Sequence, residues 1–408
     1  MGRARRKNER NRPVEGIPFM RSRSAVPASL VAAALLSVAG CSSSDGKAEN
    51  GPASSWTPGT GVSDSPSASR SADQGPPAKG SVKVLRTVTD GLNSPWGLAP
   101  LPGGGLLVSS RDEGTITRID EKTGKKTRVG TVPGVSPAGE GGLLGLAVSP
   151  DYATDHMIYA YFTTESDNRV ARVLYDEKKP AGDQLGAPNT LLKGIPKGSI
   201  HNGGRIAFGP DKMLYAGTGE TGDTGQAQDK KALGGKILRM TADGDPAEGN
   251  PVKNSVVWSY GHRNVQGLAW DDQKRLWASE FGQDTWDELN LIRAGKNYGW
   301  PEAEGRTDKS GFVDPVAQWK TSQASPSGVA WAKGSVWMAG LRGERLWRVP
   351  LDGAKRKAEP QPFLQGEYGR LRTVVAAGGD KLWLVTSETD SRGTPKKGDD
   401  RILEVEVK

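Results

Sequence analysis

The sequence has 408 residues and a formal charge of +8, a balance that would suit a nucleic-acid-binding protein. The excess lies at the start, however. Residues 1–23 hold eight Lys or Arg against two Glu, whereas the chain from Cys41 onward holds 47 basic and 45 acidic residues. This near balance argues against a nucleic-acid partner, and the single cysteine excludes a disulfide within the chain.

A short apolar run follows the basic segment. Residues 25–40, "AVPASLVAAALLSVAG", are weakly hydrophobic, shorter than a membrane span and end in small residues. They predict a signal peptide over residues 1–40, with Met20 as an alternative start. "SVAGC" resembles a bacterial lipobox, although Val38 stands where Leu is commoner. We therefore expect export, with a lipid on Cys41 that anchors the protein to the outer side of the cell membrane, or secretion; the alternative is an ordinary free thiol.

The next segment, residues 41–80, is rich in Ser, Gly, Pro and Ala and contains one aromatic residue. Such a composition buries too little apolar surface to offset chain entropy, so we expect a flexible linker. Residues 81–408 are long enough for one large core and are predicted to form the folded domain.

Within this domain a short pattern repeats six times. Apolar tripeptides such as "GLA" end at Ala99, Ala147, Ala207, Ala269, Ala330 and Ala376, at spacings of 48, 60, 62, 61 and 46 residues. A second β-prone run follows each tripeptide at 106–110, 157–162, 213–218, 275–280, 335–340 and 381–386. A third follows at 115–120, 170–175, 236–240, 288–292, 345–349 and 402–407.

These runs are short, β-branched or aromatic, and bounded by Gly, Pro and Asp, which is typical of strands. Six meanders predict an all-β fold, a six-bladed β-propeller of antiparallel blades, with a fourth strand per blade in the less regular connections. Residues 82–88, "VKVLRTV", are expected to complete the last blade and close the ring. An irregular β-sandwich is the alternative.

In such a meander the start of each first strand and the end of each second strand lie on one face, near the axis. The residues at those positions should converge on one funnel. They are Glu140, His201, Arg263, Asn264, Arg370 and Arg372 before first strands, and the loops 281–288 and 340–346, with Arg342, after second strands. Arginines around one histidine indicate an anionic ligand, with blade-to-blade salt bridges as the alternative. Four acids within 280–288 suit a hard cation such as Ca²⁺, or form a solvated acidic loop.

The ordered motifs "IHNGGRIAFGP", "GHRNVQGLAW", "DELN", "NYGWP" and "GRLRTVV" resemble the soluble quinoprotein glucose/sorbosone dehydrogenase family. The resemblance covers roughly residues 84–407. It implies a six-bladed propeller that binds pyrroloquinoline quinone (PQQ) and Ca²⁺ and oxidises an aldose sugar at C1 to the lactone. Electrons would then pass to an external acceptor that the sequence does not identify, and the protein would be a monomer or a homodimer.

The same resemblance implies roles for single residues. His201 corresponds to the general base that takes the C1 hydroxyl proton while hydride passes to PQQ. The cofactor contacts would be Glu140, Arg263, Asn264, Trp319 as an aromatic wall, Arg342, Arg370 and Arg372. Backbone carbonyls of Gly282 and Gln283 would hold the PQQ-bound calcium, and Asp287, Glu288 and Tyr298 fall in a second calcium region. Of the other histidines, His156 is expected on the opposite face and His262 behind Arg263.

Four positions depart from the best-known sugar dehydrogenase pattern. Arg342 replaces a lysine, Glu140 a glutamine, Ile200 an aspartate and Gln283 a proline. The changes at Glu140 and Ile200 leave the preferred sugar open. Two other functions remain as alternatives: a propeller that binds a partner without redox turnover, and a calcium-dependent lactonase on the same fold.

Overall fold

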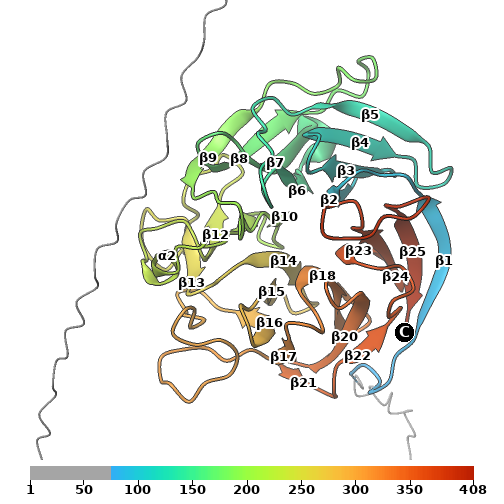
Figure 1. Ribbon diagram of the computed structural model, residues 1–408. Coiled ribbons are helices and arrows are strands. Elements are labelled where there is room, and N and C mark those ends of the chain that lie inside the picture. Colours follow the sequence, from blue (N-terminus) through green and yellow to red (C-terminus); the bar gives the residue numbers. More distant parts are fainter. Residues whose placement is uncertain (1–74) are drawn as a thin grey trace, which may run out of the picture. The chain divides into compact units, whose positions relative to one another are not determined.

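The computed structural model describes residues 75–408, in which nearly all regular structure is β-strand. The strands form six antiparallel sheets arranged as blades around a central channel, seen end-on in Figure 1. The predicted six-bladed propeller is therefore confirmed. The predicted signal peptide, Met20 and Cys41 lie outside the described residues. Between residues 75 and 408, no helix is both long and apolar enough to span a bilayer.

We number the blades in chain order, each from the channel outward. Blade 1 contains β2 (Pro95–Pro100), β3 (Leu106–Ser110), β4 (Thr115–Ile119) and β5 (Lys126–Thr131). Blade 2 contains β6 (Leu143–Val148), β7 (Met157–Thr163), β8 (Asn168–Leu174) and β9 (Asn189–Ile195). Blade 3 contains β10 (Ile206–Phe208), β11 (Leu214–Gly217), β12 (Lys236–Met240) and β13 (Val257–Tyr260). Blade 4 contains β14 (Val265–Trp270), β15 (Leu276–Glu280), β16 (Trp286–Ile292) and β17 (Ala317–Lys320).

Blade 5 departs from the four-stranded pattern. It contains β18 (Pro326–Ala332), β19 (Ser335–Gly340) and β20 (Arg345–Asp352), and its outer edge is divided between β21 (Lys355–Arg356) and β22 (Gln361–Phe363). Two single-turn helices, α1 (Tyr152–Asp155) and α2 (Gly225–Gln228), lie in connections of blades 2 and 3. The predicted strands thus account for the regular structure almost completely.

Blade 6 joins the two ends of the described chain. It contains β23 (Leu371–Gly378), β24 (Lys381–Thr386), β25 (Ile402–Val407) and, outermost, β1 (Val82–Thr89). The β1–β25 pairing runs from Val82 opposite Val407 to Thr89 opposite Ile402. The prediction that residues 82–88 close the ring is therefore confirmed, and the ring is held shut by main-chain hydrogen bonds.

The glycine that begins most of the repeated tripeptides is required by the packing of adjacent blades. At Gly145, a Cβ atom would collide with the backbone of the neighbouring blade, and at Gly267 it would collide with Ser327 of blade 5. Glycine therefore lets adjacent inner strands approach closely near the axis. Apolar side chains fill the spaces between adjacent blades in six clusters, one for each interface.

In blade 3, Arg205 occupies the tripeptide position that is Gly145 in blade 2 and Gly267 in blade 4. Its side chain is buried in the channel. Its guanidinium donates to Gln266 O of blade 4 and to Thr373 Oγ1 of blade 6, and it lies 4.4 Å from the Trp96 ring of blade 1. Burial and the nearby Arg372 lower the pKa of Arg205 to about 9. This one side chain therefore spans the channel and connects blades that are distant in sequence.

Residues 75–80, which we call the strap, pack against blade 5. Arg348 Nη2 donates to Pro77 O at 2.8 Å, and Gly80 N donates to Gln361 Oε1 at 2.9 Å. The last six residues of the predicted linker are thus held by hydrogen bonds. Pro76 also lies against the turn at Gly334, just beyond the end of β18.

Candidate active site

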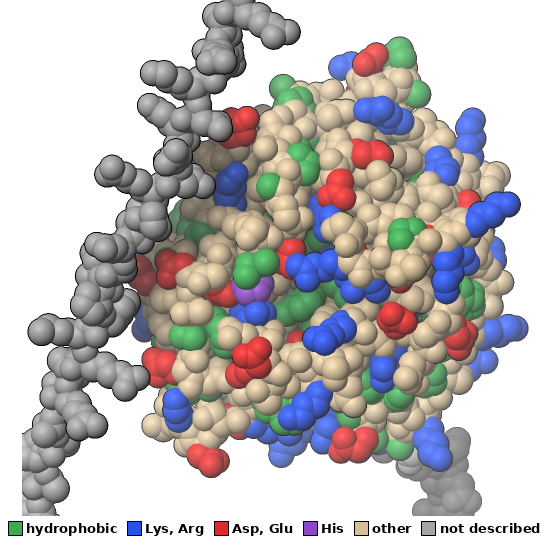
Figure 2. Space-filling view, in the orientation of Figure 1, with side chains coloured by type: hydrophobic (Ala, Val, Ile, Leu, Met, Phe, Trp, Pro, Cys, Tyr) green, Lys and Arg blue, Asp and Glu red, His purple; other side chains and the backbone are tan. Residues whose placement is uncertain are grey.

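One end of the channel opens into a cavity of about 540 Å³, which we call the funnel. It is the hollow near the centre of Figure 2, where a histidine and several basic side chains gather. Its lining comprises Trp96, Arg111, Glu140, His201, Arg263, Asn264, Gln266, Phe281, Gly282, Ser325, Leu341, Arg342, Arg370, Arg372, Asp390 and Arg392. Six of these side chains are arginines and two are acids, so the funnel favours an anionic ligand.

A larger cavity, of about 820 Å³, opens beside the strap. Its lining consists mainly of surface turns and the strap, and it contains no histidine. Lys333, just after β18, lines this cavity, whereas Ser325, just before β18, lines the funnel. The two cavities therefore lie at opposite ends of the same seven-residue strand, about 20 Å apart.

His201 lies just before β10 and is held on both sides. Its Nδ1 is 2.6 Å from Glu220 Oε1, and its backbone N–H donates to Glu140 Oε2 at 2.9 Å. Glu220 Oε2 accepts from the backbone N–H of Gly222 as well. A carboxylate at Nδ1 fixes the ring orientation and leaves Nε2 as the nitrogen available to a ligand in the funnel. Sequence reasoning missed Glu220, although it follows a second strand, β11, like the other converging residues.

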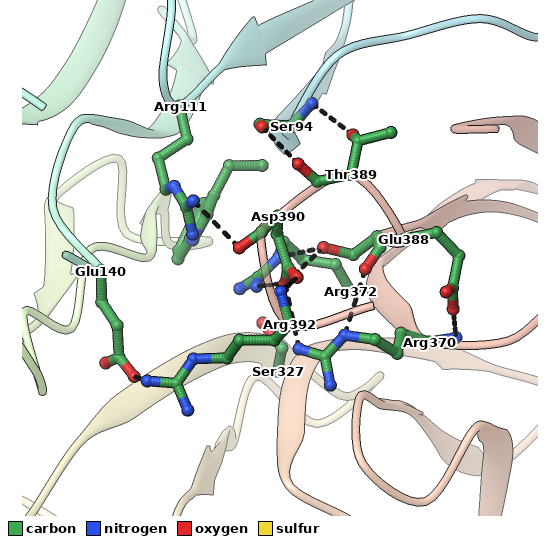
Figure 3. Close-up of polar contacts among 12 residues, drawn as sticks. Ser94, Arg111, Glu140, Ser327, Arg370, Arg372, Glu388, Thr389, Asp390 and Arg392 are labelled. Carbon is green, nitrogen blue, oxygen red and sulfur yellow. Dashed lines mark hydrogen bonds and ion pairs between the residues drawn. The ribbon is translucent and has the colours of Figure 1, made fainter. Parts of the chain in front are cut away.

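Glu140 contacts two parts of the site. In addition to the His201 backbone, it forms an ion pair with Arg392 through Oε1 at 2.8 Å (Figure 3). Ile200, the second of the two substitutions that leave the preferred sugar open, is absent from the funnel lining. Of these two substitutions, Glu140 is thus the one that directly shapes the site.

The "RLR" arginines both point at one acid. Arg370 Nη2 and Arg372 Nη2 lie 3.0 and 2.8 Å from Asp390 Oδ2 (Figure 3). Arg372 also donates from Nε to Ser387 Oγ at 3.0 Å. Burial alone would raise the pKa of Asp390, but the two guanidinium groups hold it well below its usual range. Asp390, which sequence reasoning missed, therefore fixes the direction of both arginines.

Arg263 and Asn264 form the wall between blades 3 and 4. Arg263 lies 5.5 Å from the Trp300 ring, and its buried Nε has no hydrogen-bond partner in residues 75–408. Burial lowers the pKa of Arg263. Asn264 Oδ1 accepts from Gly203 N at 2.9 Å, which ties this wall to the His201 loop. An unpaired buried guanidinium nitrogen is a free donor for an anionic or carbonyl ligand.

The predicted calcium ligands divide between the funnel and the blade behind it. Gly282 lines the funnel, whereas Asp287, Glu288 and Tyr298 are buried in blade 4 and its following loop. Burial raises the pKa of Asp287 to about 6, and burial with the neighbouring Glu280 raises that of Glu288 to about 8. Within residues 75–408, no group of three His, Cys, Asp or Glu side chains is arranged to hold a metal. Gly282 has only its backbone to offer at the funnel, and a backbone carbonyl oxygen suits a hard cation.

The tryptophan at the funnel differs from the one predicted there. Trp319 is buried in β17, the outermost strand of blade 4, where it packs 5.5 Å from Trp347. The prediction that Trp319 forms a wall over the cofactor is therefore wrong, because its sheet position places it in the core between blades 4 and 5. Trp96, at the inner strand of blade 1, lines the funnel instead and lies under Arg372 at 5.7 Å.

The other two histidines lie outside the funnel lining. His156 is exposed at the start of β7, with its ring edge against Tyr152. His262 is buried behind Arg263: Nδ1 lies 2.7 Å from Glu280 Oε2, and its ring stacks on Tyr298 at 4.6 Å. The other oxygen of Glu280 accepts from the Arg263 backbone N–H, so His262 supports the wall from behind.

Comparison with known proteins is consistent with this geometry. Residues 92–394 match the family model described as glucose/sorbosone dehydrogenase. The chain is similar to the solved PQQ-bound form of aldose sugar dehydrogenase from Streptomyces coelicolor, at 77% identity and a TM-score of 0.81, over 82% of this chain and 100% of that one.

Two curated relatives are more distant. The chain is 33% identical to an aldose sugar dehydrogenase from Escherichia coli over 65% of this chain and 73% of that protein. It is also 32% identical to quinoprotein glucose dehydrogenase B from Acinetobacter calcoaceticus, over 56% of this chain and 54% of that protein.

Proposed function

Because the chain belongs to the glucose/sorbosone dehydrogenase family, we propose that it oxidises the C1 hydroxyl of an aldose to the lactone with PQQ and Ca²⁺. The observation that carries this proposal is the funnel itself. It combines one histidine, whose Nε2 has no hydrogen-bond partner within residues 75–408, with six arginines and the backbone of Phe281 and Gly282. The aldose sugar dehydrogenase that is 77% identical to this chain was solved with PQQ bound.

The residues present fit such a cofactor. The arginines of the funnel exceed its acids by four charges, and PQQ carries three carboxylates. The unpaired Arg263 Nε offers a donor for a quinone oxygen. When bound, PQQ supplies the electrophilic quinone carbon that receives hydride, and Ca²⁺ polarises that carbonyl.

We assign the role of general base to His201. Nε2 takes the proton of the C1 hydroxyl, while Glu220 orients the ring through Nδ1 and stabilises the imidazolium that forms. Arg370, Arg372 and Arg342 would bind cofactor carboxylates. Arg342 is exposed at the funnel and makes no hydrogen bond or ion pair with any described residue, so its charge is available to a ligand.

We assign the carbonyl oxygens of Gly282 and Gln283 as ligands of the calcium ion. Electrons would then leave for an external acceptor, and the aldose would enter through the open mouth of the funnel. For localisation, we propose export directed by residues 1–40 and attachment through a lipid on Cys41.

The lactonase alternative has less support. Such an enzyme would need carboxylates from several blades around a central cation, but the two acids that line the funnel, Glu140 and Asp390, are paired with arginines. The decisive experiment adds PQQ and Ca²⁺ to the purified apo-protein and follows reduction of an artificial dye by a panel of aldoses. Dye reduction supports the proposal. Absence of both dye reduction and a PQQ binding spectrum would contradict it, and lactone opening without PQQ would favour the lactonase.

A further inference from the structure

The loop that follows β15 is held by one carboxylate oxygen. Glu304 Oε1 accepts hydrogen bonds from four consecutive backbone N–H groups: Gln283 at 2.7 Å, Asp284 at 3.0 Å, Thr285 at 2.8 Å and Trp286 at 3.0 Å. Glu304 comes from the connection between β16 and β17, about 20 residues later in the chain. A half-buried glutamate therefore acts as the centre around which this loop is wound.

The directions of these N–H groups also fix the directions of the carbonyl groups that precede them. In a trans peptide, the C=O of one residue points opposite to the N–H of the next. Because Gln283 N–H points at Glu304, the carbonyl of Gly282 points away from it. Because Asp284 N–H points at Glu304, the carbonyl of Gln283 also points away. The two oxygens that Glu304 directs are the two assigned above to calcium.

The loop before these peptides is fixed independently. Gly282 N donates to Asp287 Oδ1 at 2.9 Å, and Phe281 O accepts from Arg263 Nη1 at 3.3 Å. A Cβ atom at Gly282 would collide with Trp286 O and would lie 2.6 Å from Glu304 Oε1. The loop is thus wound too tightly around the carboxylate for a side chain at this position.

We propose that Glu304 is a positioning residue, which aims the carbonyl oxygens of Gly282 and Gln283 at the calcium ion without touching the metal. This inference rests on the proposed function. It adds a role for a residue whose own sequence neighbourhood, "PEAEGR", contains no metal-binding pattern.

The hydrogen bonds to Glu304 are of a strong kind. All four backbone N–H groups donate to the same carboxylate oxygen, and hydrogen bonds to a carboxylate are stronger than those between neutral groups. The carboxylate therefore holds the 283–286 backbone firmly. Groups that orient metal ligands from behind in this way commonly change metal affinity by roughly 10- to 100-fold when removed.

The test compares Glu304→Gln and Glu304→Ala with the wild-type chain and with a matched control, Glu302→Gln. Glu302 lies two residues away, is exposed, and its side chain makes no hydrogen bond or ion pair with residues 75–408. Uptake of PQQ into the apo-protein is followed by its absorbance during a titration with calcium chloride. Hydrogen exchange of the 283–286 amides is measured on the same samples, with thermal melting as the check on folding.

We expect the Glu304 variants to need roughly 10- to 100-fold more Ca²⁺ for half-maximal PQQ uptake, with faster amide exchange at 283–286 and full recovery of the spectrum at excess Ca²⁺. The control should match the wild type. The isosteric Glu304→Gln variant keeps the test valid if Glu304→Ala does not fold. An unchanged Ca²⁺ requirement or unchanged amide exchange in the Gln variant would overturn this inference alone. Failure of the wild-type chain to take up PQQ with Ca²⁺ would overturn the proposed function together with it.

Discussion

The imidazole Nδ1 of His201 lies 2.6 Å from the carboxylate of Glu220. Glu220 follows β11, the second strand of blade 3, and it orients His201, which precedes β10, the first strand of the same blade. His201 has φ near +53°, a conformation that asparagine tolerates better than most side chains. His201→Asn therefore removes the base with little change in backbone preference. We expect kcat for aldose oxidation to fall by roughly 10²- to 10⁴-fold, while PQQ binding persists.

The matched control is His156→Asn, since His156 is exposed, lies outside the funnel and has φ near +52°. Steady-state dye reduction and PQQ absorbance provide the two readouts. Turnover that survives in His201→Asn would assign the proton transfer to another group.

Glu220→Gln tests the orienting carboxylate. The amide retains the size of the side chain but loses the charge that stabilises the imidazolium. We expect kcat to fall at least roughly tenfold. Because the two residues act as a unit, the double variant with His201→Asn should be no slower than His201→Asn alone. Additive losses in this double-mutant cycle would show that Glu220 acts independently of His201.

Arg370→Lys tests the cofactor contact. Lysine retains the positive charge but cannot present the planar pair of donors that a carboxylate accepts. We expect Kd for PQQ to rise by roughly 10- to 100-fold in a titration at saturating Ca²⁺. The surface variant Arg356→Lys, whose guanidinium pairs with exposed Glu359, serves as the control. Equal PQQ affinities in the two variants would remove Arg370 from the cofactor site.

Asp390→Asn tests the acid that holds the "RLR" pair. The pKa of Asp390 is lower in the folded chain than its ordinary value of about 4, so its stabilisation is complete above that pH and is lost as pH falls below it. Wild-type stability should therefore decline below pH 4 with an extra slope of up to about 1.4 kcal/mol per pH unit, which the variant lacks. Urea unfolding between pH 2 and 6 measures this slope. At neutral pH the variant should be less stable by about 3 kcal/mol, because two buried cations lose their partner.

The fold could be predicted because each blade repeats the same local chemistry. The tripeptides, turns and strand runs recur in register, and the close contact at Gly145 gives a physical reason for the pattern. The same register brought His201, Arg263 and Arg370 to one funnel without any contact information. Glu220 follows the second strand β11 and so occupies an equivalent position, but it was not among the predicted residues.

The supporting residues could not be predicted in this way, because they lie in irregular connections. Asp390 reaches Arg372 from the loop between β24 and β25, and Glu304 reaches the 281–286 loop from the segment between β16 and β17. No periodic signal marks such loops, and their side chains find partners only after the blades have assembled. The error at Trp319 has the same origin, since the spacing around it is irregular and a tryptophan there fits the core equally well.

The seven residues of β18 separate the strap from the funnel, with Pro76 at one end and Ser325 at the other. The strap and the funnel therefore lie on opposite faces of the propeller. The described chain begins on the face away from the arginines, so the strap does not obstruct the mouth through which a ligand would reach His201.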